Sequence, residues 1–201
     1  MLIVGLTGNL GSGKSLIAKI FSILKVPVYN ADDVSKSFLK EKTVQEKIFR
    51  AFGQLVFSST NEIDRRALGK IVFSDSRELM KLNAILHPLV REDFMTWCNS
   101  IKDKPYIIQE AAIIFESGLK DEYDKIIDVS CPEEIAIERA MHRDSADREE
   151  VLKRMHFQWK DEKKAAMSDY IILNDGSEMV IPQVLKIHDL LINLSLQNKE
   201  I

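Results

Sequence analysis

Short apolar runs alternate with segments of helical periodicity along most of the chain. The run Leu2–Leu6 stops at a cluster of glycines, and apolar residues then recur at helical spacing from Leu16 to Leu24. Four more runs have the length of a buried strand: Val26–Tyr29, Tyr106–Gln109, Lys125–Ser130 and Tyr170–Asn174. Strands that alternate with helices predict an α/β fold with a parallel sheet flanked by helices.

The alternation breaks between residues 34 and 103, which hold several helical segments and no strand pattern. We therefore expect a helical insertion between the second and third strands. Pro88 disfavours helical geometry at the residue before it, so the sequence predicts a break at His87. The pattern divides the chain into a core of residues 1–33, 104–131 and 165–201, the insertion 34–103, and a charge-rich helical lid, 132–164.

Composition and charge exclude several classes of protein. The chain has 201 residues, of which 45% are hydrophobic and 29% charged, as in soluble globular proteins. Its net charge of −3 provides no positive field for nucleic acid or an anionic membrane. It shows no basic leader and no long apolar stretch, which predicts a cytoplasmic protein, and Cys98 and Cys131 are expected to be buried thiols. The sequence does not indicate an oligomeric state.

The segment between the first strand and the first helix carries the clearest chemical signal. Gly8-Asn-Leu-Gly-Ser-Gly-Lys-Ser15 matches the eight-position phosphate loop, or P-loop, in the context that the loop requires. Glycines allow backbone N–H groups to turn toward phosphate oxygens, and the helix adds the positive end of its dipole. Lys14 is expected to reach the β- and γ-phosphates and Ser15 to bind Mg²⁺; the alternative is a simple glycine-rich turn with Lys14 in solvent. The residues expected to contact ATP here are Gly8, Gly11, Ser12, Gly13, Lys14, Ser15 and Leu16.

Other motifs narrow the class of P-loop protein. The chain has no Asn-Lys-x-Asp sequence, which switch GTPases use to recognise guanine, and no apolar strand that ends in an Asp-Glu pair, as in motor ATPases. Kinases of small molecules remain. They need an acid near the acceptor hydroxyl and mobile arginines over the phosphoryl group.

Candidates for both roles are present. Asp32 and Asp33 follow the second strand, at the carboxyl edge of the predicted sheet, where an acceptor would bind. We assign the catalytic acid to Asp32 and expect Asp33 to cap a helix that opens at Val34. Arg139 and Arg143 lie four residues apart on one helix, so both are candidates for phosphate binding; the alternative is surface pairing with Glu138 and Asp144.

Together these residues resemble the dephospho-coenzyme A kinase family over most of the chain. The similarity begins at Leu6–Ser15 and Asn30-Ala-Asp32, where the family typically has Asp-Ala-Asp. The most specific part is a series in the insertion, which other small-molecule P-loop kinases lack. The series comprises Phe52-Gly53, Ile63-Asp-Arg65, Leu68-Gly69, Ile71-Val-Phe73 and Leu86-His-Pro-Leu-Val90, and it is followed by Glu110–Glu116, Arg139–Asp144, Arg154–Gln158, Asp169 and Asn174-Asp-Gly176.

The resemblance implies transfer of the γ-phosphoryl group of ATP to the 3′-hydroxyl of the ribose in dephospho-coenzyme A, with Mg²⁺. It implies that Asp32 is catalytic with Lys14 and Arg139, and that Glu110 holds Mg²⁺ through water. The implied acceptor-binding residues are Arg65, His87 and Glu116, besides Asp32; Arg143, Asn174 and Gly176 are assigned to ATP. From the residues alone, Arg65 pairing with Asp64 or Glu62, and His87 capping a helix break, remain alternatives.

Four positions depart from the family pattern: Leu16 replaces a hydroxyl residue, Asn30 an acid, Glu110 an aspartate and Ala112 a proline. None removes a group that phosphoryl transfer requires. Two other functions stay open: another P-loop kinase that acts on a nucleoside or nucleotide, and a regulatory module that binds ATP without transferring it.

Overall fold

The computed structural model describes residues 1–197 and divides the chain into two compact units. The core unit consists of Met1–Asn30 and the chain from Ser100 onward, and the helical unit is Ala31–Asn99. No helix within residues 1–197 is both long enough and apolar enough to cross a membrane.

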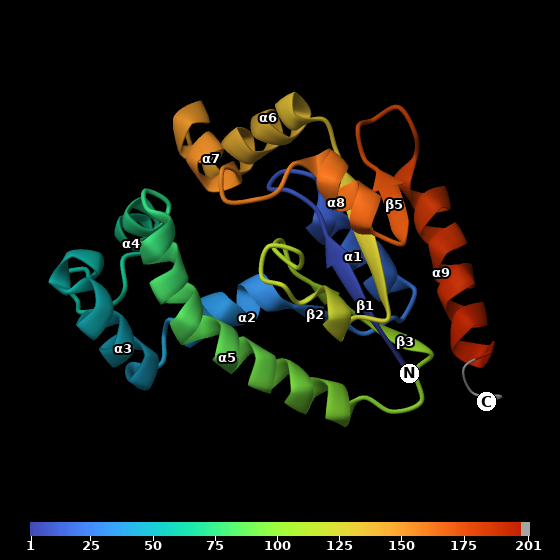
Figure 1. The fold of residues 1–201 in the computed structure, drawn as a ribbon, viewed down its shortest axis with the longest axis horizontal. Coiled ribbons are helices and arrows are strands. Elements are labelled where there is room, and N and C mark those ends of the chain that lie inside the picture. The colour runs from blue at the N-terminus through green and yellow to red at the C-terminus, as the bar shows by residue number, and fades with distance from the viewer. Residues whose placement is uncertain (198–201) are drawn as a thin grey trace. The chain divides into compact units, whose positions relative to one another are not determined.

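A five-stranded parallel sheet forms the centre of the core unit, in the order β2-β3-β1-β4-β5 (Figure 1). This confirms the predicted α/β fold. Each strand coincides, within one or two residues at either end, with an apolar run of the sequence. The strands are β1 (Leu2–Thr7), β2 (Val28–Asn30), β3 (Tyr106–Glu110), β4 (Lys125–Ser130) and β5 (Tyr170–Leu173).

Different helices and apolar clusters pack against the two faces of the sheet. Helices α1 (Lys14–Ile23) and α9 (Val180–Gln197) contact each other and share one apolar core with alternate residues of β1, β3 and β4. Ile126 points to the opposite face, where it packs in a second cluster with Phe115 and Trp159. Helix α8 (Asp161–Met167) contacts β4, and α6 (Glu133–Asp144) contacts α7 (Arg148–Met155).

The helical unit has its own core. Within residues 31–99, all of which are described, the regular elements are helical, as the sequence pattern predicted. Buried side chains from several helices meet in one apolar cluster that includes Val44, Ile48, Leu68 and Leu86. The helices are α2 (Ala31–Phe38), α3 (Lys42–Phe52), the 3₁₀ turn η1 (Gln54–Val56), α4 (Arg65–Val72) and α5 (Ser76–Ser100).

The predicted break at His87 is wrong, because α5 continues through Pro88 to Ser100. An internal proline costs a helix about 3 kcal/mol, since it removes one hydrogen bond and crowds the preceding turn. The helix continues to bury an apolar residue every fourth position on both sides of the proline, and each such side chain contributes roughly 1.5–3 kcal/mol. The buried residues are Leu86, Val90, Phe94 and Cys98. Their burial outweighs the cost of the proline, whose own side chain is exposed.

One other local expectation changes, the start of the helix that follows β2. Helix α2 begins at Ala31 and not at Val34, so Asp33 lies in its first turn and pairs with Lys36 instead of capping a later start. The amphipathic pattern of residues 179–201 also predicts a closing helix; α9 confirms it over Val180–Gln197, and residues 198–201 lie outside the described part. Cys98 and Cys131 are both buried free thiols, as expected.

Candidate active site

The P-loop connects β1 to α1 and packs tightly against the backbone of α6 and the side chain of Asn174. Gly11 has φ +82°, and a Cβ atom there would lie 1.9 Å from the carbonyl oxygen of Ala136 in α6. Gly13 has φ +96°, and a Cβ atom would lie 2.2 Å from Nδ2 of Asn174. Only glycine combines this left-handed geometry with so close an approach. The glycines at positions 11 and 13 therefore allow the loop to adopt left-handed backbone conformations in close contact with its neighbours.

The first residues of α1 include the side chains that are predicted to bind phosphate and Mg²⁺. Lys14 is buried, and its Nζ donates a hydrogen bond to the carbonyl of Asn9 at 3.3 Å, within the loop itself. Ser15 and Leu16 follow with exposed side chains. Because Lys14 is the first residue of α1, the positive end of the helix dipole lies at the loop.

A polar chain links the P-loop to the ends of two strands. Ser15 Oγ donates to Oε1 of Glu110 at 2.8 Å, and Asn30 Nδ2 donates to Oε2 of the same carboxylate at 2.8 Å. Glu110 ends β3 and Asn30 ends β2, and these residues are register partners. The fold therefore places a hydroxyl and a carboxylate, both oxygen ligands, side by side at the carboxyl edge of the sheet. Within residues 1–197, no three or more His, Cys, Asp or Glu side chains form a metal-binding group by themselves.

The two candidate arginines of α6 lie in different environments. Arg139 is half-buried, and its guanidinium donates to the carbonyl of Asn174 at 2.8 Å and to Sγ of Cys131 at 3.4 Å. Arg143 is exposed and pairs with Asp144 at 2.7 Å. Asp144 also binds Arg154 of α7 at 2.6 Å, and the hydrogen bonds from Arg143 and Arg154 lower the pKa of its carboxyl to about 2.

The loop after β5 contacts the P-loop from the side. Asn174 Nδ2 donates to the carbonyl of Ser12 at 2.7 Å, while its own carbonyl accepts from Arg139. Gly176 is exposed, with φ +91°. The structure thus brings together the P-loop and Asn174, which were predicted to bind ATP, and Arg139, which was predicted to be catalytic.

Glu116 takes part in a buried ion pair. Its Oε1 lies 2.8 Å from Nζ of Lys164, a side chain of α8 with 0% exposure, and accepts the backbone N–H of Trp159 at 2.7 Å. Lys164 also donates to the carbonyl of Ala112 at 2.8 Å. These contacts hold the turn after β3 against α8, so the structure gives Glu116 a packing role. Its predicted contact with the acceptor stays a prediction.

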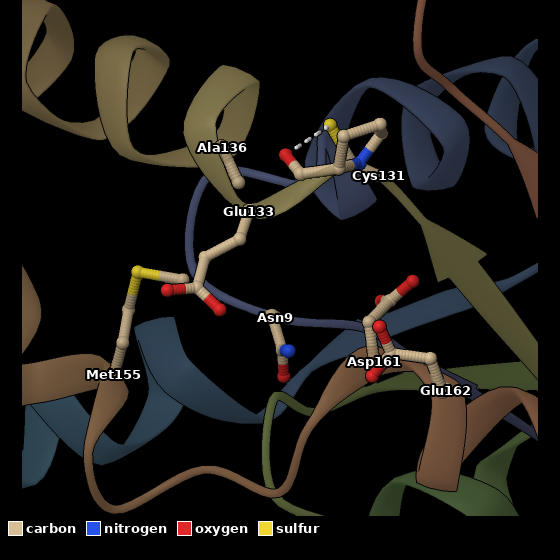
Figure 2. Close-up of a pocket in the computed structure, with 8 residues that line it drawn as sticks. Asn9, Cys131, Glu133, Ala136, Met155, Asp161 and Glu162 are labelled. Atoms are coloured by element: carbon tan, nitrogen blue, oxygen red, sulfur yellow. Dashed lines mark hydrogen bonds between the residues drawn. The ribbon is translucent and has the colours of Figure 1, made fainter.

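A pocket of about 70 Å³ lies beside the P-loop, between the beginning of α6 and the beginning of α8 (Figure 2). Asn9 lines it from the loop, and Met155 and Ala136 line it from α7 and α6. Its other polar walls include the carboxylates of Glu133, Asp161 and Glu162. Like charges repel strongly at short range in a confined space, so this acidic pocket is not suited to a triphosphate.

Three predicted site residues belong to the helical unit. Asp32 is exposed in the first turn of α2, two residues after the end of β2. Arg65 is exposed as the first residue of α4, whose amino end is capped by Asp64. His87 is half-buried in the middle of α5, and burial lowers the pKa of its imidazole. Because α5 is continuous, His87 does not cap a helix break.

Several polar groups near the site carried no role in the sequence analysis. Gln158 and Asn9 join two segments about 150 residues apart, and Lys164 is fully buried. Asp128, in the middle of β4, is also fully buried. The visible signals were an acid within the apolar run Lys125–Ser130 and the place of Gln158 at the end of the family-like series Arg154–Gln158. The other contacts join residues that are distant in the sequence, so no local sequence pattern predicts them.

Comparisons with known proteins identify the family to which the chain is similar. The dephospho-CoA kinase family model matches residues 2–179. A dephospho-CoA kinase of Bacteroides fragilis is 35% identical over 185 residues, which cover 92% of this chain and 90% of that protein. A dephospho-CoA kinase of Aquifex aeolicus is also 35% identical, with coverage of 92% and 95%.

Solved structures lead to the same family. A crystal structure from Thermus thermophilus superposes with a TM-score of 0.82 at 32% identity, covering 94% of this chain and 96% of the other. Dephospho-CoA kinase from Campylobacter jejuni gives a TM-score of 0.66 at 26% identity, with 98% of both chains covered. A shikimate kinase from Acinetobacter baumannii, at 13% identity and a TM-score of 0.53, shares the fold alone. The chain belongs to the dephospho-CoA kinase family.

Proposed function

We propose that this chain transfers the γ-phosphoryl group of ATP to the 3′-hydroxyl of the ribose of dephospho-coenzyme A, which yields coenzyme A and ADP. The observation that carries the proposal is the junction of the P-loop with Glu110, in a chain of this family. Ser15 holds a carboxylate oxygen at 2.8 Å, and Lys14 begins the same helix. The P-loop amides and Lys14 suit a nucleoside triphosphate, and the oxygens of Ser15 and Glu110 suit a hard cation.

The oxygen ligands at the junction fit Mg²⁺. In the proposal the Ser15 hydroxyl is a direct ligand and Glu110 binds through a water molecule, as Mg²⁺ favours because it keeps several waters. The ion would neutralise charge on the β- and γ-phosphates. Asn30 would keep Glu110 in place, since it binds the carboxylate oxygen that Ser15 does not.

The remaining roles fall to side chains around this junction. Lys14 would bind the β- and γ-phosphates, and the P-loop amides would hold the phosphate chain. Arg139, which already contacts the loop after β5, would stabilise charge on the transferred group. Asp32 would orient the acceptor hydroxyl or accept its proton. Arg65 and His87 would bind the acceptor, and the lid of residues 132–164 would cover the site and exclude water.

One assay tests the activity. The purified protein is incubated with ATP, Mg²⁺ and dephospho-coenzyme A, and coenzyme A is measured by mass. ADP release is measured in parallel with a panel of nucleosides and nucleotides as acceptors. We expect coenzyme A as the product and little turnover with the panel. Turnover with another acceptor alone would contradict the proposed substrate, and nucleotide binding without any product would indicate a regulatory module.

Asp32→Asn tests the acid. The substitution keeps the size of the side chain and removes its charge, so kcat should fall by at least about 100-fold, as for the loss of a general base. Binding of both substrates, measured by calorimetry, should change little. Asp33→Asn is the matched control, because Asp33 lies next in the same turn and pairs with Lys36. Near-normal turnover of Asp32→Asn would refute the assignment.

A further inference from the structure

Two successive residues of the P-loop are hydrogen bonded to one distant segment of the chain. The backbone N–H of Leu10 donates to Oε1 of Gln158 at 2.8 Å, and Asn9 Nδ2 donates to the carbonyl of Trp159 at 3.1 Å. Residues 156–160 join α7 to α8 and lie within the charge-rich region 132–164. The amino-terminal half of the P-loop is therefore attached to this segment, which we call the α7–α8 connection.

The α7–α8 connection is itself firmly held. The N–H of Trp159 donates to Glu116 at 2.7 Å, and Glu116 pairs with the fully buried Lys164. The ring of Trp159 stacks on Phe115, with ring centres 6.1 Å apart and planes 6° apart. A segment with a backbone anchor, a buried ion pair and a stacked ring has few alternative positions. It can therefore act as a fixed support for the loop.

The other half of the loop has a second support. Asn174 Nδ2 donates to the carbonyl of Ser12 at 2.7 Å, from the loop after β5. Gln158 thus holds an N–H group of the loop and Asn174 holds a carbonyl group, two residues apart. Phosphate binding requires that the remaining N–H groups of the loop converge on one point. Two amide side chains that fix Leu10 and Ser12 would restrict the intervening peptide planes.

We infer that Gln158 is a positioning residue for phosphoryl transfer, which acts through the backbone of the P-loop and not by touching the nucleotide. The inference rests on the proposed function. Catalysis of phosphoryl transfer depends almost entirely on positioning and charge stabilisation, so a small displacement of the loop lowers the rate steeply. Gln158 also ties the loop to the segment that follows the arginines of α6 and α7.

Gln158→Met tests the inference, because methionine keeps the length of the side chain and removes the acceptor of the Leu10 N–H. We expect kcat to fall on the order of tenfold, with a smaller change in KM for dephospho-coenzyme A. Gln158→Asn, one methylene shorter, should have the same effect. Gln158→Glu keeps an acceptor oxygen, so kcat should recover to within about threefold, while its charge raises KM for ATP.

Asp124→Leu is the matched control. Asp124 Oδ2 accepts the N–H of Ile3 at 2.7 Å, at the opposite end of β1 from Leu10. Its loss likewise removes a side-chain acceptor from one backbone N–H, and we expect a lower melting temperature with kcat close to that of the wild type. An equal loss of kcat in Asp124→Leu and Gln158→Met would mean that Gln158 contributes only stability, and the inference would fall.

A readout without turnover separates this inference from the proposed function. Hydrogen exchange of the Leu10 amide should be faster in Gln158→Met than in the wild type, and in Asp124→Leu it should be unchanged. The affinity for ADP, measured by calorimetry, should fall in Gln158→Met only. If the wild type makes no coenzyme A, these two measurements still decide whether Gln158 orders the loop. Unchanged exchange and unchanged ADP affinity would overturn the inference.

Discussion

Two buried carboxylates lie on either side of the central strand β1, and they differ in almost every contact. Glu110 of β3 is the register partner of Leu6, and Asp128 of β4 is the register partner of Thr7. Their exposed fractions are 3% and 0%. They therefore occupy similar depths, next to consecutive residues of the strand that leads into the P-loop.

The difference lies in their hydrogen bonds. Each oxygen of Glu110 accepts a hydrogen bond of 2.8 Å, one from Ser15 and one from Asn30. Neither oxygen of Asp128 has a hydrogen-bond partner among the described residues. A buried carboxylate is stable as an anion only where donors replace the lost water. Glu110 meets this condition and Asp128 does not.

The comparison teaches that burial by itself does not mark a functional acid. Burial, and then the nearby charge of Asp161, raise the pKa of Asp128 to about 7. Lys164 and Lys14 act in the opposite direction, and Glu116 adds to the increase. Glu110 accepts hydrogen bonds from Ser15 and Asn30 at the proposed metal site, while Asp128 lies near α8 and accepts no hydrogen bond from the described residues. We interpret the first as built for function and the second as a cost to stability.

The largest expected effect follows from Asp128. The pKa of its carboxyl is about 7 in the folded chain, against 3.8 for an aspartate in an unfolded chain. The protonated form is thus favoured in the fold, and wild-type stability should fall as the pH rises from about 4 to 7, by up to about 4 kcal/mol. Asp128→Asn removes this titration. Urea unfolding at pH 5 and pH 8 should show that its stability relative to the wild type increases with pH.

Asp144→Asn is the control, because the pKa of Asp144 is shifted in the opposite direction from that of Asp128. The pKa of Asp144 is about 2, because Arg143 and Arg154 bind its carboxylate. That group stabilises the fold above its unfolded pKa, so Asp144→Asn should lose stability at pH 5 and at pH 8. If Asp128→Asn were also less stable than the wild type at pH 8, the interpretation of Asp128 as an unsupported anion would be wrong.

Most of the framework was predictable because it depends on local pattern. Each strand is an apolar run bounded by polar residues, and the P-loop is a contiguous motif between a strand and a helix. The helix break at His87 failed because the proline rule is local, whereas the buried series from Leu86 to Cys98 extends over both sides of it. The apolar periodicity from Leu86 to Cys98 predicts the continuous helix that the structure shows.

The supports of the site were not predictable from one sequence. Gln158 and Leu10 are 148 residues apart, and Asn174 and Ser12 are 162 residues apart. Such pairs form only when the order of strands places loops side by side, and many glutamines and asparagines would fit the local sequence equally well. The P-loop pattern and the family resemblance had already assigned Ser15 and Glu110, which are 95 residues apart, to one Mg²⁺, but did not predict their direct hydrogen bond. The family resemblance named Glu116 as a contact for the acceptor, and the structure shows it in an ion pair with Lys164.

The next effect concerns Glu110. Glu110→Gln keeps the shape of the side chain but removes its charge, and its NH₂ group takes the place of one of the two carboxylate oxygens that accept from Ser15 and Asn30. We expect kcat to fall by about 100-fold, since one charged partner of the proposed Mg²⁺ is lost. The Mg²⁺ concentration for half-maximal rate should rise in the same assay. A normal rate with unchanged Mg²⁺ dependence would show that Glu110, like Asp128, is only a buried acid.

The smallest effect comes from Asn30, whose removal should make Glu110 resemble Asp128. Asn30→Leu keeps the shape of the side chain and deprives Oε2 of its 2.8 Å donor, so the free energy of unfolding should fall by about 2 kcal/mol. Turnover should fall less than tenfold, because Ser15 still holds Oε1. A double-mutant cycle gives the decisive reading: if Asn30 acts on the reaction through Glu110, then Asn30→Leu changes kcat little in the Glu110→Gln background. Additive losses would mean that Asn30 affects the reaction by a route that does not pass through this carboxylate.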